Sequence, residues 1–247
     1  MRVRYIEPIG SDLHVERSLA VLRAAAPEGV EVEVTHLTLP ADLAGPMLPP
    51  VPLYLNEIIS EVLRAESEGC DAAIIGCCTD PALPEAQRVA GIPVVGPLQA
   101  AAAVALSRGH RLGILYPDEH AWRVTANWAR RNLRTYGASE VVGPIEFVPM
   151  HVEGEASLVG DVEVSAEEVQ GRFRRQLHGP GVAAARELTA RDSADALLFG
   201  CTLWGGMVAE IADQIAAQCL DPVVTALHVA VAQAAIARAP AVRLGAV

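Results

Sequence analysis

The feature that most constrains the fold of this chain is an internal duplication. Residues 71–80 read DAAIIGCCTD, and residues 195–204 read DALLFGCTLW. In each copy an acidic residue precedes a short apolar run, a glycine follows the run, and a cysteine comes directly after the glycine. The copies begin 124 residues apart in a chain of 247. We therefore expect two related halves, each of which presents one cysteine at the same structural point.

A second echo lies downstream of each copy. The segment 92–95 reads IPVV, the segment 221–224 reads DPVV, and an alanine-rich helical stretch follows each of them. These two segments are 129 residues apart, so the duplication stays almost in register. The echo equates the two Pro-Val-Val segments, and the first of them is a predicted strand.

Predicted strands alternate with predicted helices through both halves. That order predicts mostly parallel sheets with helices on both faces, which is the α/β fold class. In such sheets ligands bind beyond the carboxyl ends of the strands, and we expect Cys77 and Cys201 at those ends. The expected strands cover residues 2–7, 30–39, 93–95, 111–116, 145–150 and the two cysteine segments.

Turn and cap residues divide the predicted elements. Ser11 is expected to cap the first helix through its hydroxyl, and residues 165–168 (SAEE) form a capping-box pattern. Gly and Pro at 179–181 are expected to interrupt a helix. Residues 40–52 contain five prolines, and residues 151–164 are irregular and acidic. Each of these two long segments is interpreted as a flap over a site.

Composition and charge exclude several classes of function. The formal net charge of −11 argues against nucleic acid or an anionic membrane as a partner, because both require a basic face. No apolar run reaches the roughly 18 residues of a membrane span. The N-terminus lacks the pattern of a secretory signal, so we expect a cytoplasmic protein. No glycine-rich phosphate loop follows a strand, so no nucleotide cofactor is expected.

The five cysteines are expected to be reduced thiols in such a compartment. They show no Cys-x-x-Cys spacing and no clustering with histidine, so we expect no metal site. Cys70 and Cys219 are interpreted as buried, inert thiols. A cysteine that ends an apolar strand is commonly just a small buried hydrophobe. Two of them at equivalent points of a duplication, Cys77 and Cys201, favour a chemical role.

A thiol at a strand end, facing the start of a helix, lies near backbone N–H groups and the positive end of the helix dipole. Both stabilise a thiolate, so we expect a lowered pKa for Cys77 and Cys201. Thr79 and Thr202 add hydroxyl donors nearby. If the halves face each other across a cleft, one thiolate can remove a proton from a carbon while the other thiol delivers one to the opposite face. Such a pair inverts a stereocentre without a cofactor, and the N–H and hydroxyl donors stabilise the enolate-like intermediate.

At these residues the chain resembles the aspartate/glutamate/hydantoin racemase superfamily, most closely its hydantoin racemase branch. The resemblance implies two pseudo-symmetric α/β domains, no cofactor, a homo-oligomer, and Cys77 and Cys201 as the acid/base pair on either side of the substrate. It also implies that the C-terminal helix returns to the first domain, which gives domains of 1–103 plus 220–247 and of 104–219. The similar segments are 75–77 (IGC), 80–83 (DPAL), 92–96 (IPVVG), 100–101 (AA), 132–137 (NLRTYG) and 198–202 (LFGCT).

The chain departs from the hydantoin racemase pattern at positions where the family contacts its substrate. The turn after the first strand is EPIGS at 7–11 instead of Asn-Pro-Asn-Ser/Thr, and YPD stands at 116–118 instead of a threonine-rich turn. Glu7 either binds an amine or turns away from the site. Besides Thr79 and Thr202, the candidate substrate-binding residues are Ser11, Cys78, Tyr116 and Leu203.

The sequence leaves three hypotheses open. The first is a racemase or epimerase that acts on the carbon alpha to a carboxylate, amide or hydantoin carbonyl. The second is a decarboxylase or a maleate-type cis–trans isomerase of the same superfamily, although two cysteines disfavour the decarboxylase. The third is a small-molecule binding protein without activity, for which neither cysteine would be needed.

Overall fold

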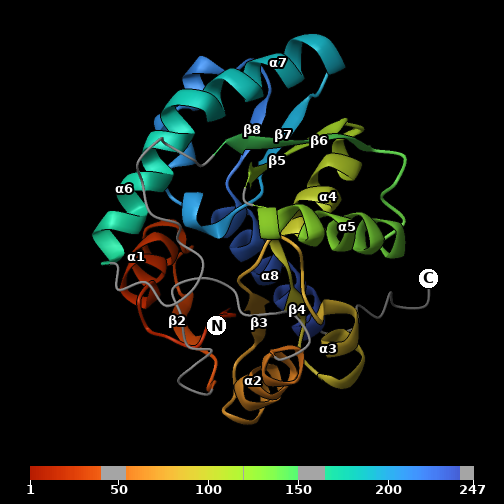
Figure 1. Ribbon diagram of the computed structural model, residues 1–247. Helices are drawn as coiled ribbons and strands as arrows, with labels where there is room; N and C mark the ends of the chain where they lie inside the picture. Colours follow the sequence, from red (N-terminus) through yellow and green to blue (C-terminus); the bar gives the residue numbers. More distant parts are fainter. Residues whose placement is uncertain (40–53, 119, 150–164, 240–247) are drawn as a thin grey trace, which may run out of the picture.

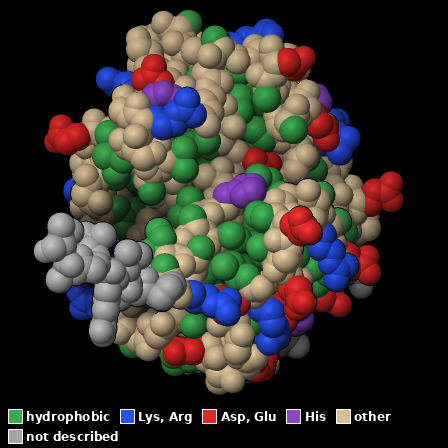
Figure 2. All heavy atoms as spheres, turned by 180° about the vertical axis from the view of Figure 1, so that it is seen from behind, with side chains coloured by type: hydrophobic (Ala, Val, Ile, Leu, Met, Phe, Trp, Pro, Cys, Tyr) green, Lys and Arg blue, Asp and Glu red, His purple; other side chains and the backbone are tan. Residues whose placement is uncertain are grey.

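The computed structural model describes residues 1–39, 54–118, 120–149 and 165–239 (Figure 1). The two segments interpreted as flaps, 40–52 and 151–164, lie outside the described residues. Among the helices that are described, none is long and apolar enough to cross a membrane. On the face shown in Figure 2, acidic and basic side chains are interspersed among apolar ones.

The described strands form two parallel four-stranded sheets with the same topology. The first sheet has the order β2-β1-β3-β4 and the second has the order β6-β5-β7-β8. All strand pairs are parallel, which confirms the predicted α/β class and the internal duplication. The strands are β1 (Arg2–Glu7), β2 (Glu31–His36), β3 (Ala72–Ile75), β4 (Val94–Val95), β5 (Leu112–Asp118), β6 (Val142–Pro149), β7 (Ala196–Phe199) and β8 (Gln218–Leu220).

Helices cover both faces of each sheet because successive strand residues point to opposite faces. In β1, Tyr5 packs against α8 on one face, whereas Ile6 packs against α2 and α3 on the other. In β5, Ile114 joins the cluster of α4 and α5, and Leu115 joins that of α6 and α7. The α-helices are α1 (Val15–Ala25), α2 (Leu55–Ser67), α3 (Leu83–Val89), α4 (Pro97–Arg108), α5 (His120–Thr135), α6 (Ala166–Gln176), α7 (Val182–Asp192) and α8 (Pro222–Arg238).

The C-terminal helix α8 follows the second sheet but packs onto the first. Figure 1 shows it in the middle of the molecule, and its residues Val223, Leu227 and Ala230 belong to the same apolar cluster as Val3 and Ile74. Helix α4 also contacts α8. The domain boundaries 1–103 plus 220–247 and 104–219 stay a prediction.

The two Pro-Val-Val segments, which the sequence similarity equates, do not occupy equivalent positions in the two sheets. Val94 pairs with Ala73 in the first sheet, and Cys219 pairs with Leu197 in the second. The counterpart of the first Pro-Val-Val strand is therefore β8, whereas the second Pro-Val-Val begins α8. Proline is favoured in the first turn of a helix, where its missing N–H is not needed. The Asp221 carboxylate also caps this helix by accepting hydrogen bonds from two of its backbone N–H groups.

One other local prediction is wrong, and two are confirmed. Ser11 does not cap the first helix, because the chain makes a further turn, in which the Val15 N–H donates to the Asp12 carbonyl, before α1 begins. The predicted interruption at 179–181 is confirmed, because α6 ends at Gln176 and α7 begins at Val182. A π-helical turn, Leu177–Gly181, carries the chain from α6 into α7, because this wider turn accommodates the missing N–H of Pro180. The Ser165 cap of α6 is confirmed by a 3.1 Å bond from the Glu168 N–H.

Candidate functional site

The first cysteine turn begins where β3 ends. The Gly76 N–H donates to the Ile6 carbonyl of the neighbouring strand β1 at 2.9 Å. This bond continues the pairing of β1 with β3 just beyond the end of β3. The Cys77 N–H then donates to the Ile75 carbonyl at 2.8 Å, and the Cys77 carbonyl accepts from the Asp80 N–H at 3.0 Å. These bonds bend the chain sharply at the cysteine.

The second cysteine turn repeats these bonds. The Gly200 N–H donates to the Leu115 carbonyl at 2.7 Å, and the Cys201 N–H donates to the Phe199 carbonyl at 2.8 Å. The Cys201 carbonyl accepts from the Trp204 N–H at 2.9 Å. Both cysteines therefore sit at the same point of the same turn, as the sequence predicts.

The glycine before each cysteine is required by packing. A Cβ atom on Gly76 would lie 2.5 Å from the Cε1 atom of Tyr5. A Cβ atom on Gly200 would lie 2.8 Å from the Cε1 atom of Tyr116 and equally close to a backbone oxygen. Both distances are too short for a real side chain, and Tyr5 and Tyr116 are buried and cannot swing away. Each glycine thus lets a tyrosine ring pack directly against a strand end.

The two thiols are nearly buried, each with 7% of its residue surface exposed. The Cys77 sulfur lies 3.2 Å from the Thr79 hydroxyl. Backbone N–H groups also face the thiols, that of Thr79 at Cys77 and that of Leu203 at Cys201, and each of these bonds lowers the thiol pKa. The Thr79 hydroxyl and the backbone N–H groups predicted from the sequence are therefore present at the thiols, whereas the Thr202 hydroxyl donates to the Gly76 carbonyl instead.

The predicted lowering of the thiol pKa values is wrong for this structure. Burial raises the pKa of Cys77 to about 11 and that of Cys201 to about 12, against the effect of the nearby N–H groups. Neither thiol faces a long helix. A short 3-10 turn, Thr202–Trp204, follows Cys201, and α3 begins only at Leu83. The loss of water therefore outweighs the effect of the N–H groups on both thiols.

The two cysteine turns meet at the interface between the halves. The Thr202 hydroxyl donates to the Gly76 carbonyl at 3.2 Å, so each turn contacts the other directly. The two thiols also interact electrostatically, since a negative charge on Cys77 raises the pKa of Cys201. The structure thus brings together the two cysteines that the duplication singles out.

Cys78 and Tyr116 also lie at this interface, where the Tyr116 hydroxyl bonds to the protein and the Cys78 thiol is buried. The Tyr116 hydroxyl donates to the Cys78 carbonyl at 2.6 Å, which links β5 to the first cysteine turn. The Cys78 thiol is buried in the apolar cluster that contains Leu98 and Ile114. Ser11 differs from them, since its buried hydroxyl has no hydrogen-bond partner among the described residues.

Glu7 is a buried carboxylate at the end of β1, and its charge acts on both thiols. Only 5% of its surface is exposed, and the Ser18 hydroxyl donates to its Oε1 atom. Burial raises the pKa of Glu7 to about 7, while the Ser18 bond and the Arg17 charge lower it. The Glu7 charge in turn raises the pKa of Cys77 and of Cys201. Glu7 therefore turns inward, which the sequence leaves open.

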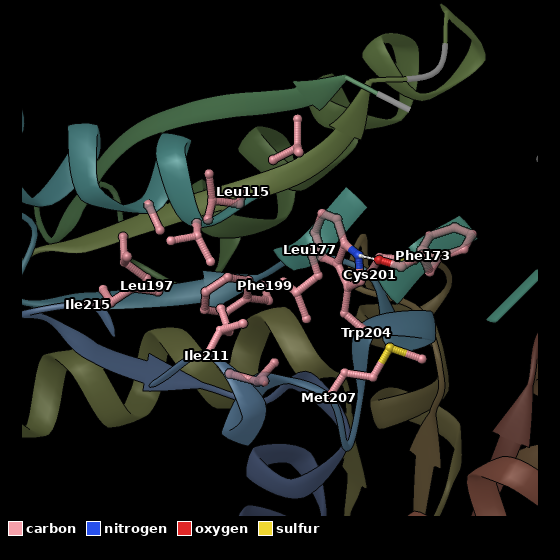
Figure 3. Packing of buried hydrophobic residues seen from close by; sticks show 14 of the residues in the cluster. Leu115, Phe173, Leu177, Leu197, Phe199, Cys201, Trp204, Met207, Ile211 and Ile215 are labelled. Carbon is pink, nitrogen blue, oxygen red and sulfur yellow. Dashed lines mark hydrogen bonds between the residues drawn. The ribbon is translucent and has the colours of Figure 1, made fainter. Parts of the chain in front are cut away.

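The second cysteine turn is embedded in the core of its own half through Trp204. This side chain is fully buried, and its indole N–H donates to the Phe173 carbonyl at 3.2 Å (Figure 3). Its ring packs edge-on against Phe173 and Phe199, with 6.3 Å between centroids in each case. Aromatic pairs of this geometry hold the turn rigidly against β7.

Asp80 holds the first cysteine turn in a different way, which sequence reasoning missed. Its carboxylate accepts hydrogen bonds from the N–H groups of Leu98 and Gln99 at 3.0 and 2.7 Å, and so caps α4. The Tyr136 hydroxyl donates to the same carboxylate at 3.0 Å. A signal was available, because Asp80 and Tyr136 both lie in segments that resemble the racemases.

Cys70 and Cys219 do not belong to the two cysteine turns. Cys70 is buried, with its sulfur 3.2 Å from the Glu33 carboxylate, whereas Cys219 is only half-buried, contrary to expectation. Cys219 is part of β8 in the second sheet, at the edge of the apolar cluster. Within the described part of the chain, no three His, Cys, Asp or Glu side chains are grouped so that they could hold a metal ion.

Comparisons with known proteins agree on one family. A model of the Asp/Glu/Hydantoin racemase family matches residues 4–232. The hydantoin racemase of Rhizobium meliloti is 24% identical over 173 residues, which are 70% of this chain and 64% of that protein. The hydantoin racemase of Pseudomonas sp. (strain NS671) is 28% identical over 172 residues, 70% of this chain and 60% of that protein. The chain thus matches less than two thirds of the length of either relative.

The fold is also found among solved structures. Allantoin racemase from Klebsiella pneumoniae superposes with a TM-score of 0.72 at 20% sequence identity. The superposition covers 96% of this chain and 88% of that one. The similarity therefore extends over both sheets and the helices that cover them.

Proposed function

Because this chain belongs to the Asp/Glu/hydantoin racemase family, we propose that it is a cofactor-independent racemase or epimerase. It inverts the carbon alpha to a carboxylate, amide or hydantoin carbonyl. The observation that carries this proposal is the pair of equivalent cysteine turns, which meet through the bond between Thr202 and Gly76. A hydantoin ring is the first substrate to test, because the similar curated proteins are hydantoin racemases. A homo-oligomer and a cytoplasmic location remain predictions.

In the proposed reaction one cysteine acts as thiolate and the other as thiol. The thiolate takes the proton from the alpha carbon, whose electron pair delocalises onto the adjacent carbonyl as an enolate. The second thiol then donates its proton to the opposite face of the carbon and becomes the thiolate. Cys77 and Cys201 exchange these roles with the handedness of the substrate. Because their pKa values are about 11 and 12, the thiolates are strong bases once they form.

The neighbouring groups have supporting roles in this proposal. The N–H groups of Thr79 and Leu203 stabilise whichever sulfur carries the charge. The unpartnered hydroxyl of Ser11 is available to a substrate oxygen or nitrogen. The hydroxyls of Thr79, Thr202 and Tyr116 bond to the protein, so they act on the turns in the absence of substrate.

Substitution of each cysteine tests the two-thiol scheme. We expect Cys77→Ser and Cys201→Ser each to lose racemisation of hydantoins by a factor on the order of 10² or more, as for loss of an acid/base group. The measurement is solvent deuterium incorporation from each enantiomer separately, followed by mass spectrometry. Cys219→Ser is the matched control and should retain the wild-type rate. Full exchange from both enantiomers in both variants would disprove the scheme.

Assays with other substrates separate the remaining hypotheses. A decarboxylase would release CO₂ from malonates, and a cis–trans isomerase would convert maleate, so both are assayed beside the hydantoins. Turnover of one of these substrates that depends on a single cysteine would replace the racemase proposal. Binding of ligands without any turnover would favour a small-molecule binding protein.

A further inference from the structure

Each cysteine turn is held by a side chain from the opposite half. Arg17 lies on α1 in the first half, and its guanidinium donates to backbone carbonyls of the second cysteine turn. The bonds reach the Leu203 carbonyl at 2.8 Å, the Thr202 carbonyl at 3.4 Å, and the Gly205 carbonyl. One side chain thus satisfies three carbonyls of the turn that carries Cys201.

Asn132 makes the reciprocal contact. It lies on α5 in the second half, and its amide Nδ2 donates to the carbonyls of Thr79 and Asp80 at 2.8 and 3.0 Å. Tyr136, one helical turn further on, donates its hydroxyl to the Asp80 carboxylate. These carbonyls belong to the turn that carries Cys77, which is part of the first half.

The two contacts occupy equivalent places in the duplicated fold. Helix α1 follows β1 and helix α5 follows β5, and these strands occupy equivalent positions in the two sheets. The helix after the first strand of each half therefore reaches the cysteine turn of the other. The turn carbonyls are partly withdrawn from water at this interface, and carbonyls that lose both water and donors are costly. Separation of the halves would remove these donors from both turns.

We propose that Arg17 and Asn132 are positioning residues that hold the opposite half's cysteine turn in its reactive geometry. Their importance for catalysis rests on the proposed function, whereas their effect on the thiols does not. Arg17 and Asn132 also give the two cysteines different electrostatic surroundings. Arg17 brings a positive charge near Cys201, together with the negative groups Glu7 and Asp221, whereas Asn132 brings a neutral amide to the Cys77 turn.

The test measures the reactivity of each cysteine separately in the full-length protein. Iodoacetamide alkylation is followed over time and over a range of pH, and peptide mass spectrometry reads Cys77 and Cys201 in the same sample. We expect Arg17→Gln to change the alkylation rate of Cys201 by roughly five-fold or more, as for directly coupled neighbours, with Cys77 within about two-fold. Asn132→Ala should change the alkylation rate of Cys77 and leave that of Cys201 within about two-fold. Arg17→Lys keeps the charge and should restore part of the wild-type pH profile of Cys201.

Matched controls lie on the same helices. Arg23→Gln on α1 and Asn127→Ala on α5 make the same chemical changes at exposed positions and should leave both thiols unchanged. The proposal is overturned if neither thiol responds, or if both respond together in each variant, which would mean general loosening. If Arg17→Gln does not fold, Arg17→Lys carries the test through the alkylation rate. Its ammonium cannot reproduce the guanidinium bonds to three carbonyls, so the Cys201 rate should change even though the charge is kept. An unchanged Cys201 rate in Arg17→Lys together with an unchanged Cys77 rate in Asn132→Ala overturns the proposal.

A second readout ties the positioning role to catalysis. Neither side chain is proposed to contact the substrate, so racemisation by the variants should fall in kcat with little change in KM. If no racemase activity is found in the wild type while the alkylation pattern holds, the proposed function fails and the positioning role stands. A wild-type racemase whose variants show unchanged kcat would overturn the positioning role alone.

Discussion

Glu7 shows at the scale of one residue how burial creates a group that titrates near neutral pH. Glu7 is the last residue of β1, and its carboxylate accepts a hydrogen bond from the Ser18 hydroxyl on α1. Burial raises the pKa of Glu7 from 4.5 to about 7. A raised pKa means that the folded state binds the proton more tightly than the unfolded chain does. Stability from this group is therefore complete below pH 4.5 and is lost as the pH rises to about 7.

We predict that Glu7→Gln removes this loss of stability with rising pH. Glu7→Gln cannot ionise and keeps an oxygen for the Ser18 bond, so it should lose no stability between pH 4 and pH 8 at this site. We expect the variant to gain on the order of 2–3 kcal/mol relative to the wild type over that range. Urea denaturation at both pH values measures it, with exposed Glu16→Gln as control. A difference between variant and wild type that does not depend on pH would contradict the prediction.

At the scale of elements, the duplicated helices α4 and α8 begin in the same way but are capped differently. Both have proline at the first position, Pro97 and Pro222. Asp221 caps α8 from the position directly before its proline, whereas α4 has Gly96 there and takes its cap from Asp80 in the cysteine turn. A Cβ atom on Gly96 would lie 2.2 Å from the Asp80 carboxylate, so the glycine makes room for the distant cap.

The second prediction concerns the local cap of α8. Asp221→Ala should destabilise the fold by about 1–2 kcal/mol, because the N–H groups of Val223, Val224 and Gly206 lose their acceptor. Asp221→Asn should cost less, since the amide oxygen still accepts hydrogen bonds and burial already disfavours the charge by raising the pKa of Asp221. Urea unfolding midpoints of the two variants measure the difference. Equal losses in Ala and Asn would show that the charge, and not the cap, is what matters.

At the scale of the whole molecule, the chain crosses between the halves more than once. Helix α8 follows the second sheet and covers the first. Helix α4 contributes Ala100 to the core of the first half and Leu98 and Ala101 to that of the second. Together with the contacts between the cysteine turns, these crossings tie the stability of each half to the other.

The third prediction is that both halves unfold in one transition. All three tryptophans lie in the second half, so their fluorescence reports on the second sheet. Alkylation of buried Cys70, read by mass spectrometry, reports on the first. We expect the two probes to give coincident urea midpoints, as in a two-state transition. Separate midpoints would mean that the halves are independent, and would weaken the case for coupling through Arg17 and Asn132.

The sequence by itself determined the α/β class, the duplication and the place of Cys77 and Cys201 at strand ends. Each of these depends on the order of residues along the chain, because apolar runs, glycines and repeats are local patterns. The same local reasoning misplaced the Pro-Val-Val echo, since the sequence similarity between 92–95 and 221–224 does not reveal that the second segment starts a helix. Pairing of β8 with β7 decided that point.

Only the tertiary structure decided the surroundings of the thiols. The raised pKa values of Cys77 and Cys201 come from the exclusion of water at the interface, which no spacing of residues records. Nothing in the sequence distinguishes Arg17 on α1 from a solvated helix arginine. The fold places it against the turn at Thr202, 185 residues away. Groups distant in the chain meet there, and their mutual charges and hydrogen bonds exist only once the two halves have packed together.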